Sequence, residues 1–371
     1  MADNAERVNV FRDAIKQNLG PVWKYLEDKS VSEILINAAD EIFVERKGKL
    51  ERVPERFADE DTLRAAINSI AQSVGRRISE DEPRLDARLP DGSRFAAVIP
   101  PCSRKGSTLS IRKFTNSKIS FGDYIKLGAI TEDAARFLDV CMFLGKNIIV
   151  SGGTGSGKTT LLGLMSARIP KGYRVIVIED ASELQIDYEH VVFFETKQAD
   201  AQGKGEVTIK DLLKSSLRLR PDRIIVGEVR SSEAIELINA MNTGHKGSMG
   251  TVHANSPEDA IVRLEALAQS GDARVSEKAL RQQVSSAIDL IIQVSRFSDG
   301  SRKVSHISEV LGFNEDGSYR VVPLFEIQNM RRGPDGKFSG HIEATGEIPS
   351  FMQEIIDNNL PFPKSKFQKA A

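Results

Sequence analysis

Apolar positions along the chain follow one pattern before residue 131 and another after it. In the first part, short apolar runs predict strands at 33–36, 41–45, 87–89, 95–99 and 108–112. A helical stripe lies between them and consists of Leu63, Ala66, Ile67, Ile70 and Val74. A shorter N-terminal helix is predicted from the face formed by Val8, Phe11, Ile15 and Leu19. This part is therefore expected to be a small α+β domain.

After residue 131 the predicted strands alternate with predicted helices. The apolar runs expected as strands are 147–150, 174–179, 191–194, 223–227 and 289–294. Helical spacing follows the first run, and helix-start signals occur at Thr208 and at Ser256-Pro257. Such alternation is typical of an α/β fold with a mostly parallel sheet. Shorter strands with Asp-Gly turns are expected after residue 300.

The change of pattern and the 371-residue length predict two domains. We expect an N-terminal α+β domain over 1–113, a polar linker over 114–130 and an α/β domain over 131–345 with appended C-terminal strands. Residues 346–371 are expected to form a polar C-terminal tail, and its end, residues 364–369, is most simply solvated.

The composition restricts the class of function and the cellular compartment that are expected. The formal net charge of −1 argues against a dedicated nucleic-acid binder, so no direct nucleic-acid contact is expected. Two cysteines provide no disulfide framework, which suits a reducing compartment. No signal peptide is evident, and no apolar run approaches the ~20 residues that cross a bilayer. We therefore expect a cytoplasmic protein, or one held peripherally at a membrane by a partner.

Residues 152–159 match the phosphate-binding loop pattern G-x-x-x-x-G-K-[ST], and we call this segment the phosphate loop. It lies between a predicted strand and a predicted helix, where glycines let the backbone wrap a phosphate and unpaired N–H groups point at it. A glycine-rich turn with a chance lysine is the alternative, and the context disfavours it. Nucleotide binding is assigned to Gly152, Gly153, Thr154, Gly155, Ser156, Gly157, Lys158, Thr159 and Thr160. Lys158 would reach the β- and γ-phosphates, and Thr159 would hold Mg²⁺.

Hydrolysis also needs carboxylates beside the loop. Glu228 follows the apolar run 223–227 and is the candidate on the metal side, although such a residue can also be a solvated strand end. An acidic box, residues 179–183, follows another predicted strand and holds three carboxylates. It could be a solvated turn, but ligands of such sheets bind at this edge. Spacing alone does not decide which of the three would position water.

Histidines and arginines complete the set of candidates. His245 and His253 fall in one glycine-rich stretch, residues 244–253, which we call the His box. A structural role is the simpler alternative, and the spacing suits zinc poorly, so sensing of a γ-phosphate is favoured. Arginine can supply charge to the transition state. The candidates are Arg112, Arg218, Arg220 and Arg230, together with Arg84, Arg88 and Arg94 near the predicted hairpin, although a surface role is the alternative for each.

The chain resembles the secretion ATPase superfamily, because it has the four motifs of that superfamily in the same order. They are the phosphate loop, the acidic box, the segment 220–228, which we call the strand box, and the His box. Its members power type II secretion, type IV secretion and type IV pili. The segments 86–94, 99–101, 109–114 and 247–256 are similar to the CpaF branch, which serves tight-adherence (Flp) pili.

The resemblance implies a RecA-like P-loop NTPase domain, with helices on both faces of its sheet, after a smaller N-terminal domain. It implies ATP and Mg²⁺ as cofactors, a homohexamer with nucleotide between the two domains, and an inner-membrane platform protein as partner. By the same resemblance Glu183 is the catalytic glutamate. Glu228 lies on the metal side, and His245 and His253 are the box histidines. Arg112 and Arg220 match positions that approach the γ-phosphate.

An ATP-hydrolysing assembly motor is the preferred function. A conjugation ATPase or another nucleic-acid-linked translocase is the alternative, which the balanced charge and the lack of interleaved basic and aromatic residues disfavour. A scaffold that binds nucleotide without hydrolysis is a third possibility, and the intact Lys158, Thr159, Glu183 and Glu228 argue against it.

Overall fold

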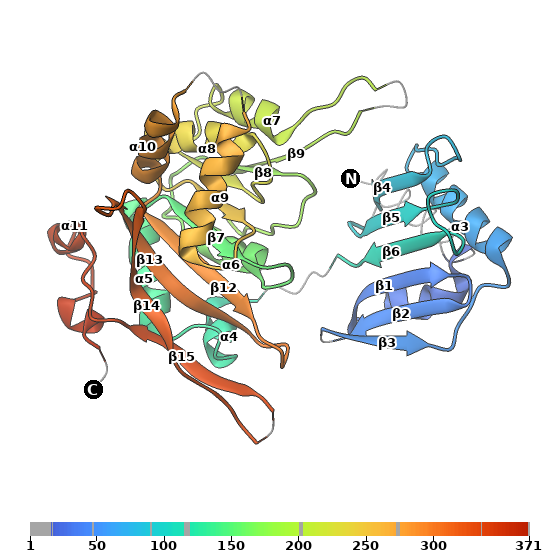
Figure 1. Cartoon of the computed structure of the whole chain (residues 1–371), viewed down its shortest axis with the longest axis horizontal. Coiled ribbons are helices and arrows are strands. Elements are labelled where there is room, and N and C mark those ends of the chain that lie inside the picture. Colours follow the sequence, from blue (N-terminus) through green and yellow to red (C-terminus); the bar gives the residue numbers. More distant parts are fainter. Residues whose placement is uncertain are drawn as a thin grey trace. The chain divides into compact units, whose positions relative to one another are not determined.

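The computed structural model describes residue 16 and residues 18–46, 48–89, 91–114, 119–199, 203–271, 275–334 and 336–369. It forms two compact units, which divide between Ser117 and Lys118 (Figure 1). Both units contain a sheet with helices packed against it. Among the described residues, no helix combines the length and the apolar character that crossing a bilayer requires.

The first unit is built on a six-stranded antiparallel sheet in the order β3-β2-β1-β6-β5-β4. Its strands are β1 (Val31–Ala38), β2 (Glu41–Arg46), β3 (Lys49–Val53), β4 (Arg84–Arg88), β5 (Arg94–Val98) and β6 (Thr108–Arg112). Its helical elements are η1 (Gly20–Val22), α2 (Trp23–Glu27) and α3 (Glu60–Ser73). All strands expected from the sequence are present, and β3 is an additional one.

Buried and more exposed residues alternate along the strands, and the buried ones form the core of this unit. Ile34 and Ile36 of β1 are fully buried and belong to the same apolar cluster as Leu63 and Ile67 of α3. The predicted α+β character and the predicted helix at 63–74 are thus confirmed. Val8, Phe11 and Ile15 of the expected N-terminal helix lie outside the described residues.

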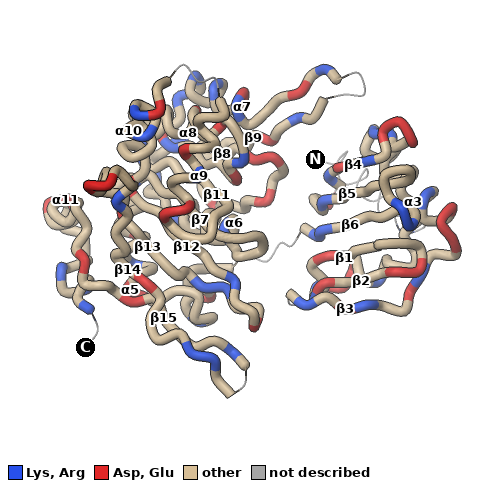
Figure 2. The backbone as a smooth tube through the Cα atoms, in the orientation of Figure 1, with Lys and Arg blue, Asp and Glu red and all other residues tan. Residues whose placement is uncertain are grey.

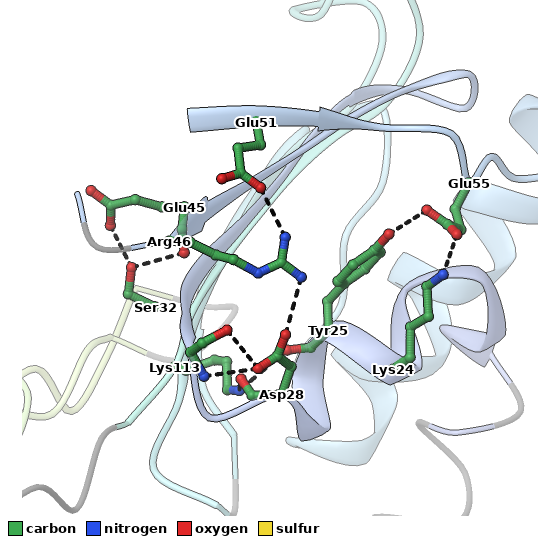
Figure 3. A network of polar contacts seen from close by, with 10 residues as sticks. Lys24, Tyr25, Asp28, Ser32, Glu45, Arg46, Glu51, Glu55 and Lys113 are labelled. Atoms are coloured by element: carbon green, nitrogen blue, oxygen red, sulfur yellow. Dashed lines mark hydrogen bonds and ion pairs between the residues drawn. The ribbon is translucent and has the colours of Figure 1, made fainter. Parts of the chain in front are cut away.

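A polar network ties α2 to the sheet (Figure 3). Arg46 of β2 forms ion pairs of 3.0 Å with both Asp28 and Glu51. Lys113, just after β6, donates to the backbone oxygens of Tyr25 and Asp28. Hydrogen bonds from Ser30, together with Arg46, hold the pKa of Asp28 down at about 2. The network fixes the end of β6, the last strand of this unit along the chain.

The second unit is built on a nine-stranded sheet in the order β15-β14-β13-β12-β7-β11-β10-β8-β9. The six strands from β12 to β9 are parallel, and β13, β14 and β15 add an antiparallel extension at one side. The strands are β7 (Ile148–Gly152), β8 (Val175–Glu179), β9 (Val191–Glu195), β10 (Arg223–Val226), β11 (Met249–Val252), β12 (Leu290–Arg296), β13 (Arg302–Phe313), β14 (Tyr319–Arg332) and β15 (Phe338–Ala344).

Helices cover both faces of this sheet (Figure 1). Ile148 and Val150 of β7 join one apolar cluster, with α4 (Phe121–Lys126), α5 (Glu132–Leu144), α6 (Lys158–Ser166) and α11 (Met352–Asp357). Ile149 points to the opposite cluster, with α7 (Ile209–Ser216), α8 (Glu233–Asn242), α9 (Pro257–Gln269) and α10 (Glu277–Ala287). The expected mostly parallel, RecA-like α/β domain is confirmed.

Three expectations need correction. The segment 114–130 is not wholly a linker, because Ser120 caps α4 and the side chains of Phe121 and Tyr124 are buried in the second unit. The C-terminal tail is not wholly solvated, because Met352 and Ile355 of α11 and Phe367 of η2 (Lys364–Phe367) are buried in the same core. The strands after residue 300 are also long, with 12 residues in β13 and 14 in β14.

Candidate functional site

Four neighbouring parallel strands, in the order β7-β11-β10-β8, bring most of the predicted residues to one edge of the sheet. The phosphate loop follows β7, His253 follows β11, Glu228 lies two residues after β10, and Glu183 lies in the acidic box after β8. Because parallel strands end at the same edge, residues remote in sequence converge there. The place of β11 between β7 and β10 puts His253 between the loop and Glu228.

The phosphate loop has the backbone that its glycines permit. Gly155 and Gly157 have positive φ angles of 68° and 97°. At Gly152 a Cβ atom would lie 2.3 Å from the carbonyl oxygen of Val294, so only glycine fits. Gly153, Thr154, Gly155 and Thr160 are exposed, whereas Ser156 is buried. Helix α6 begins at Lys158, so its first N–H groups lie at the loop, as an anion site requires.

Lys158 is buried and directed back across the loop. Its Nζ donates to the carbonyl oxygen of Gly153 at 3.0 Å and lies 3.4 Å from Nδ1 of His253. Burial lowers the pKa of Lys158, and the Glu228 carboxylate acts in the opposite direction. The ammonium of Lys158 therefore donates to an acceptor, the Gly153 carbonyl oxygen, that a phosphate oxygen could replace.

Glu228 is held from two sides. Nε2 of His253 lies 2.6 Å from its Oε1, and Arg230 donates to its Oε2. Arg230 also reaches Asp180 of the acidic box at 3.4 Å. Burial and the neighbouring Lys158 lower the pKa of His253, which favours a neutral imidazole at pH 7. The pair is a close contact rather than a hydrogen bond, because Oε1 of Glu228 has no hydrogen-bond partner among the described residues.

Glu179 organises the acidic box. Its Oε1 accepts the backbone N–H groups of Glu183 and Leu184, both at 2.9 Å. Burial raises the pKa of Glu179 to about 6. A Cβ at Gly227 would lie 2.8 Å from Cγ of Glu179, so glycine next to Glu228 makes room for this side chain. Glu179 therefore fixes the turn that presents the half-buried Glu183.

Arg302, which the sequence patterns do not identify, also contacts the loop. It begins β13, and its Nε donates to the carbonyl oxygen of Gly155 at 2.8 Å. A Cβ at Gly157 would lie 3.5 Å from Cδ of Arg302. Local spacing carries no signal for this contact, because it depends on how the β12–β13 pair lies beside β7.

The structure does not bring His245 and Arg220 to the phosphate loop. His245 lies in the loop before β11, where its Nδ1 is 3.2 Å from the carbonyl oxygen of Ala240. Arg220 is exposed, has a φ of 53°, and precedes β10. Both lie at the amino ends of their strands and therefore at the opposite edge of the sheet. Arg112 lies at the end of β6 in the first unit.

The residues present suit Mg²⁺ held largely by phosphate. Among the described residues, no group of three or more His, Cys, Asp or Glu side chains could hold a metal ion by itself. Mg²⁺ commonly takes one or two protein oxygens together with phosphate oxygens and water. The hydroxyl of Thr159 and the carboxylate of Glu228 are two of the oxygens at this edge and could take that part.

A RecA-like sheet with a phosphate loop and carboxylates at its carboxyl edge defines a P-loop ATPase. The chain belongs to the type II/IV secretion system protein family, whose model matches residues 16–319.

Relatives agree with this family assignment, and solved structures agree with the fold. The conjugal transfer protein TrbB of Rhizobium radiobacter is 34% identical over 295 residues, which cover 78% of this chain and 87% of that protein. The type IV secretion system protein VirB11 of Bartonella quintana is 31% identical over 328 residues, with coverage of 78% and 91%. The fold resembles the pilus retraction motor PilT with bound ADP, with a TM-score of 0.55, 21% identity and coverage of 91% and 85%. It also resembles the Legionella pneumophila ATPase DotB, with a TM-score of 0.55, 20% identity and coverage of 80% and 82%.

Proposed function

We propose that this protein hydrolyses ATP with Mg²⁺ as the motor of a type IV machine that assembles tight-adherence (Flp) pili. The observation that carries the hydrolytic part is the convergence of Lys158, His253 and Glu228, with the turn that bears Glu183 on the next strand. This set joins a phosphate-binding cation to carboxylates at one sheet edge, which is what phosphoryl transfer to water needs.

Each residue has a role in this proposal. The loop amides and Lys158 bind the phosphates, and the Thr159 hydroxyl, with Glu228, holds Mg²⁺. When bound, Mg²⁺ neutralises charge on the β- and γ-phosphates. Glu183 orients the attacking water, and His253 responds to the γ-phosphate through its contacts with Lys158 and Glu228. Arg112 is the arginine proposed to supply transition-state charge, and Arg220 and His245 are proposed to reach the bound ATP only from a neighbouring subunit.

The assembly is proposed from the resemblance of the sequence motifs. The active form is a homohexamer in the cytoplasm, bound peripherally at the inner membrane through a platform protein. Nucleotide-driven changes of the ring would move pilin subunits through that partner. The proposal includes no direct contact with nucleic acid, in line with the net charge of −1.

Pilus assembly is preferred because the segments 86–94, 99–101, 109–114 and 247–256 resemble the tight-adherence branch. Conjugation is a second candidate, and the 34% identity with a conjugal transfer protein favours it. Deletion of the gene in the native cell separates the two. Loss of surface pili with normal DNA transfer supports the first candidate, and the reverse result supports the second. Co-purification of inner-membrane proteins would identify the machine.

Two substitutions test the hydrolytic roles. Lys158→Ala should abolish ATP binding and turnover, because the phosphates lose their main cation. Glu183→Gln should abolish turnover while ATP still binds, because only the water-orienting carboxylate is lost. Glu189→Gln, at an exposed position beyond the acidic box, is the control. Wild-type turnover in Glu183→Gln would refute the role of Glu183.

A further inference from the structure

A second cavity lies at the opposite edge of the same sheet from the phosphate loop. Its volume is about 380 Å³, and its lining residues precede β7, β8, β10 and β11 or begin them. Those with polar side chains are Tyr173, Asp222, Arg223, Thr243, His245 and Lys246. The phosphate loop, Glu183 and Glu228 all follow the carboxyl ends of these strands, so this cavity is separate from the site described above.

Arg223 is the central residue of the cavity. It is 1% exposed, and its burial lowers the pKa of the guanidinium. One N–H group donates to the carbonyl oxygen of Met142 at 2.8 Å, and the guanidinium lies 4.7 Å from the centre of the Tyr173 ring. Its Nε has no hydrogen-bond partner, and no carboxylate in the described part of the chain lies within ion-pair distance of Arg223, although Tyr173 and the more distant Asp222 partly offset the effect of burial on its pKa. A buried cation without a bound anion is costly, so this position favours an anionic ligand.

The surroundings of Arg223 are rigid. A Cβ at Gly247 would lie 2.8 Å from its Cζ, so the loop 243–248 packs directly on the guanidinium. The N–H groups of Gly247 and Ser248 bond to Oδ1 of the buried Asn147. The hydroxyl of Ser248 donates to the His245 carbonyl oxygen and accepts from the N–H of Ile224. These bonds hold His245 and Lys246 at the rim.

The charge around the cavity is mostly positive. Arg223 and the exposed Lys246 are cations, and His245 adds an imidazole. Asp222 is the carboxylate among the lining residues, and its Oδ2 accepts the backbone N–H of Arg174 at 2.6 Å. Guanidinium and ammonium groups around one space are the arrangement that binds phosphate. The volume lies in the range of small-molecule sites.

We propose that this cavity, with Arg223 at its base and Lys246 and His245 at its rim, binds a small phosphate-bearing anion at a second site. The ligand is a free phosphate or the phosphates of a nucleotide. The proposal does not depend on which machine the ATPase serves. Ligand binding here would brace the loop 243–248 that leads into β11, the strand that ends at His253.

The test measures binding of inorganic phosphate and of pyrophosphate by equilibrium dialysis of the full chain. Because the phosphate loop also binds these anions, all variants carry Lys158→Ala. We expect this background to keep one saturable site. Adding Lys246→Ala should weaken anion binding at this site about tenfold or more, since a charge-assisted hydrogen bond is worth about 1.5–3 kcal/mol. Adding Lys364→Ala, at another exposed lysine, should leave binding unchanged.

Two results would overturn the proposal. One is absence of saturable binding in the Lys158→Ala background. The other is equal affinity with and without Lys246→Ala. Both double variants must keep the unfolding midpoint of the background, which is expected because Lys246 and Lys364 are exposed. Tighter binding of pyrophosphate than of phosphate would assign the site to a nucleotide, and equal binding would assign it to a single phosphate.

Discussion

His253 and Glu228 form a direct pair, with Nε2 of the imidazole 2.6 Å from Oε1 of the carboxylate. The pair exists because β11 and β10 are parallel neighbours, so the residues that follow them meet at one edge. Lys158 also contacts the imidazole, with its Nζ 3.4 Å from Nδ1 and 3.5 Å from Nε2. A phosphate that moves Lys158 therefore changes the surroundings of His253, and through it those of Glu228.

Replacement of His253 by alanine should impair turnover more than binding. Loss of the hydrogen bond between His253 and the charged Lys158 ammonium, about 1.5–3 kcal/mol, corresponds to a kcat lower by roughly 10- to 100-fold. The affinity for a fluorescent ATP analogue should change little, because the loop and Lys158 remain. His253→Gln keeps a side chain that can form hydrogen bonds, so its kcat should lie between those of the wild type and His253→Ala. His341→Ala, at an exposed position of β15, is the control, and wild-type kcat in His253→Ala would contradict the coupling.

Glu179 gives a prediction about stability and pH. Its pKa is raised from 4.5 to about 6, so the folded state binds the proton more tightly than the unfolded chain does. Stability is therefore lost as the pH rises from 4.5 through 6, by at most about 2 kcal/mol from this group. Glu179→Gln cannot ionise and can still accept both N–H groups. It should be more stable than the wild type at pH 7.5, with little difference at pH 4.5.

The measurement is the urea-unfolding midpoint of the second unit at both pH values. Glu189→Gln serves as the control because its carboxylate is exposed. The unfolding midpoints of Glu179→Gln and the wild type could also differ by the same amount at both pH values. That result would show that ionisation of the buried Glu179 carboxylate does not destabilise the folded state.

The sequence predicted the parts of the site that depend on local pattern. The phosphate loop and Glu228 each adjoin an apolar strand, and β11, which pairs in parallel with both of these strands, brings them to one edge. The same local signal could not separate His253 from His245, because both lie in one glycine-rich stretch. Only the position of β11 shows that one histidine follows the strand and the other precedes it.

The contacts that were missed join segments far apart in the sequence. Arg302 reaches Gly155 because β12 pairs with β7 and β13 pairs with β12. The tail appeared solvated by composition, yet Phe351, Phe362 and Phe367 pack around Phe137 of α5. Pairing order and side-chain packing determine both features, and neither leaves a periodic trace in the sequence.

Arg302 should support nucleotide affinity by shaping the loop. Its Nε bond to the Gly155 carbonyl is worth about 0.5–1.5 kcal/mol, so Arg302→Ala should weaken ATP binding by up to about tenfold. The kcat at saturating ATP should change much less, because Glu183 and Glu228 are untouched. Arg320→Ala, at an exposed position of β14, controls for loss of one positive charge. Equal ATP affinity in the two variants would exclude this role.

Phe367 should be a principal anchor of the C-terminal segment. It is fully buried, with its ring centre 5.3 Å from that of Phe137 and 5.1 Å from that of Phe362. Phe367→Ala should lower the free energy of unfolding by about 3–5 kcal/mol, because it leaves a cavity in a packed aromatic cluster. Phe367→Leu should cost less, and Lys369→Ala, at the exposed end, should cost almost nothing. Urea unfolding followed by circular dichroism measures all three. If Phe367→Ala unfolded at the midpoint of Lys369→Ala, the segment would not stabilise the ATPase unit in solution.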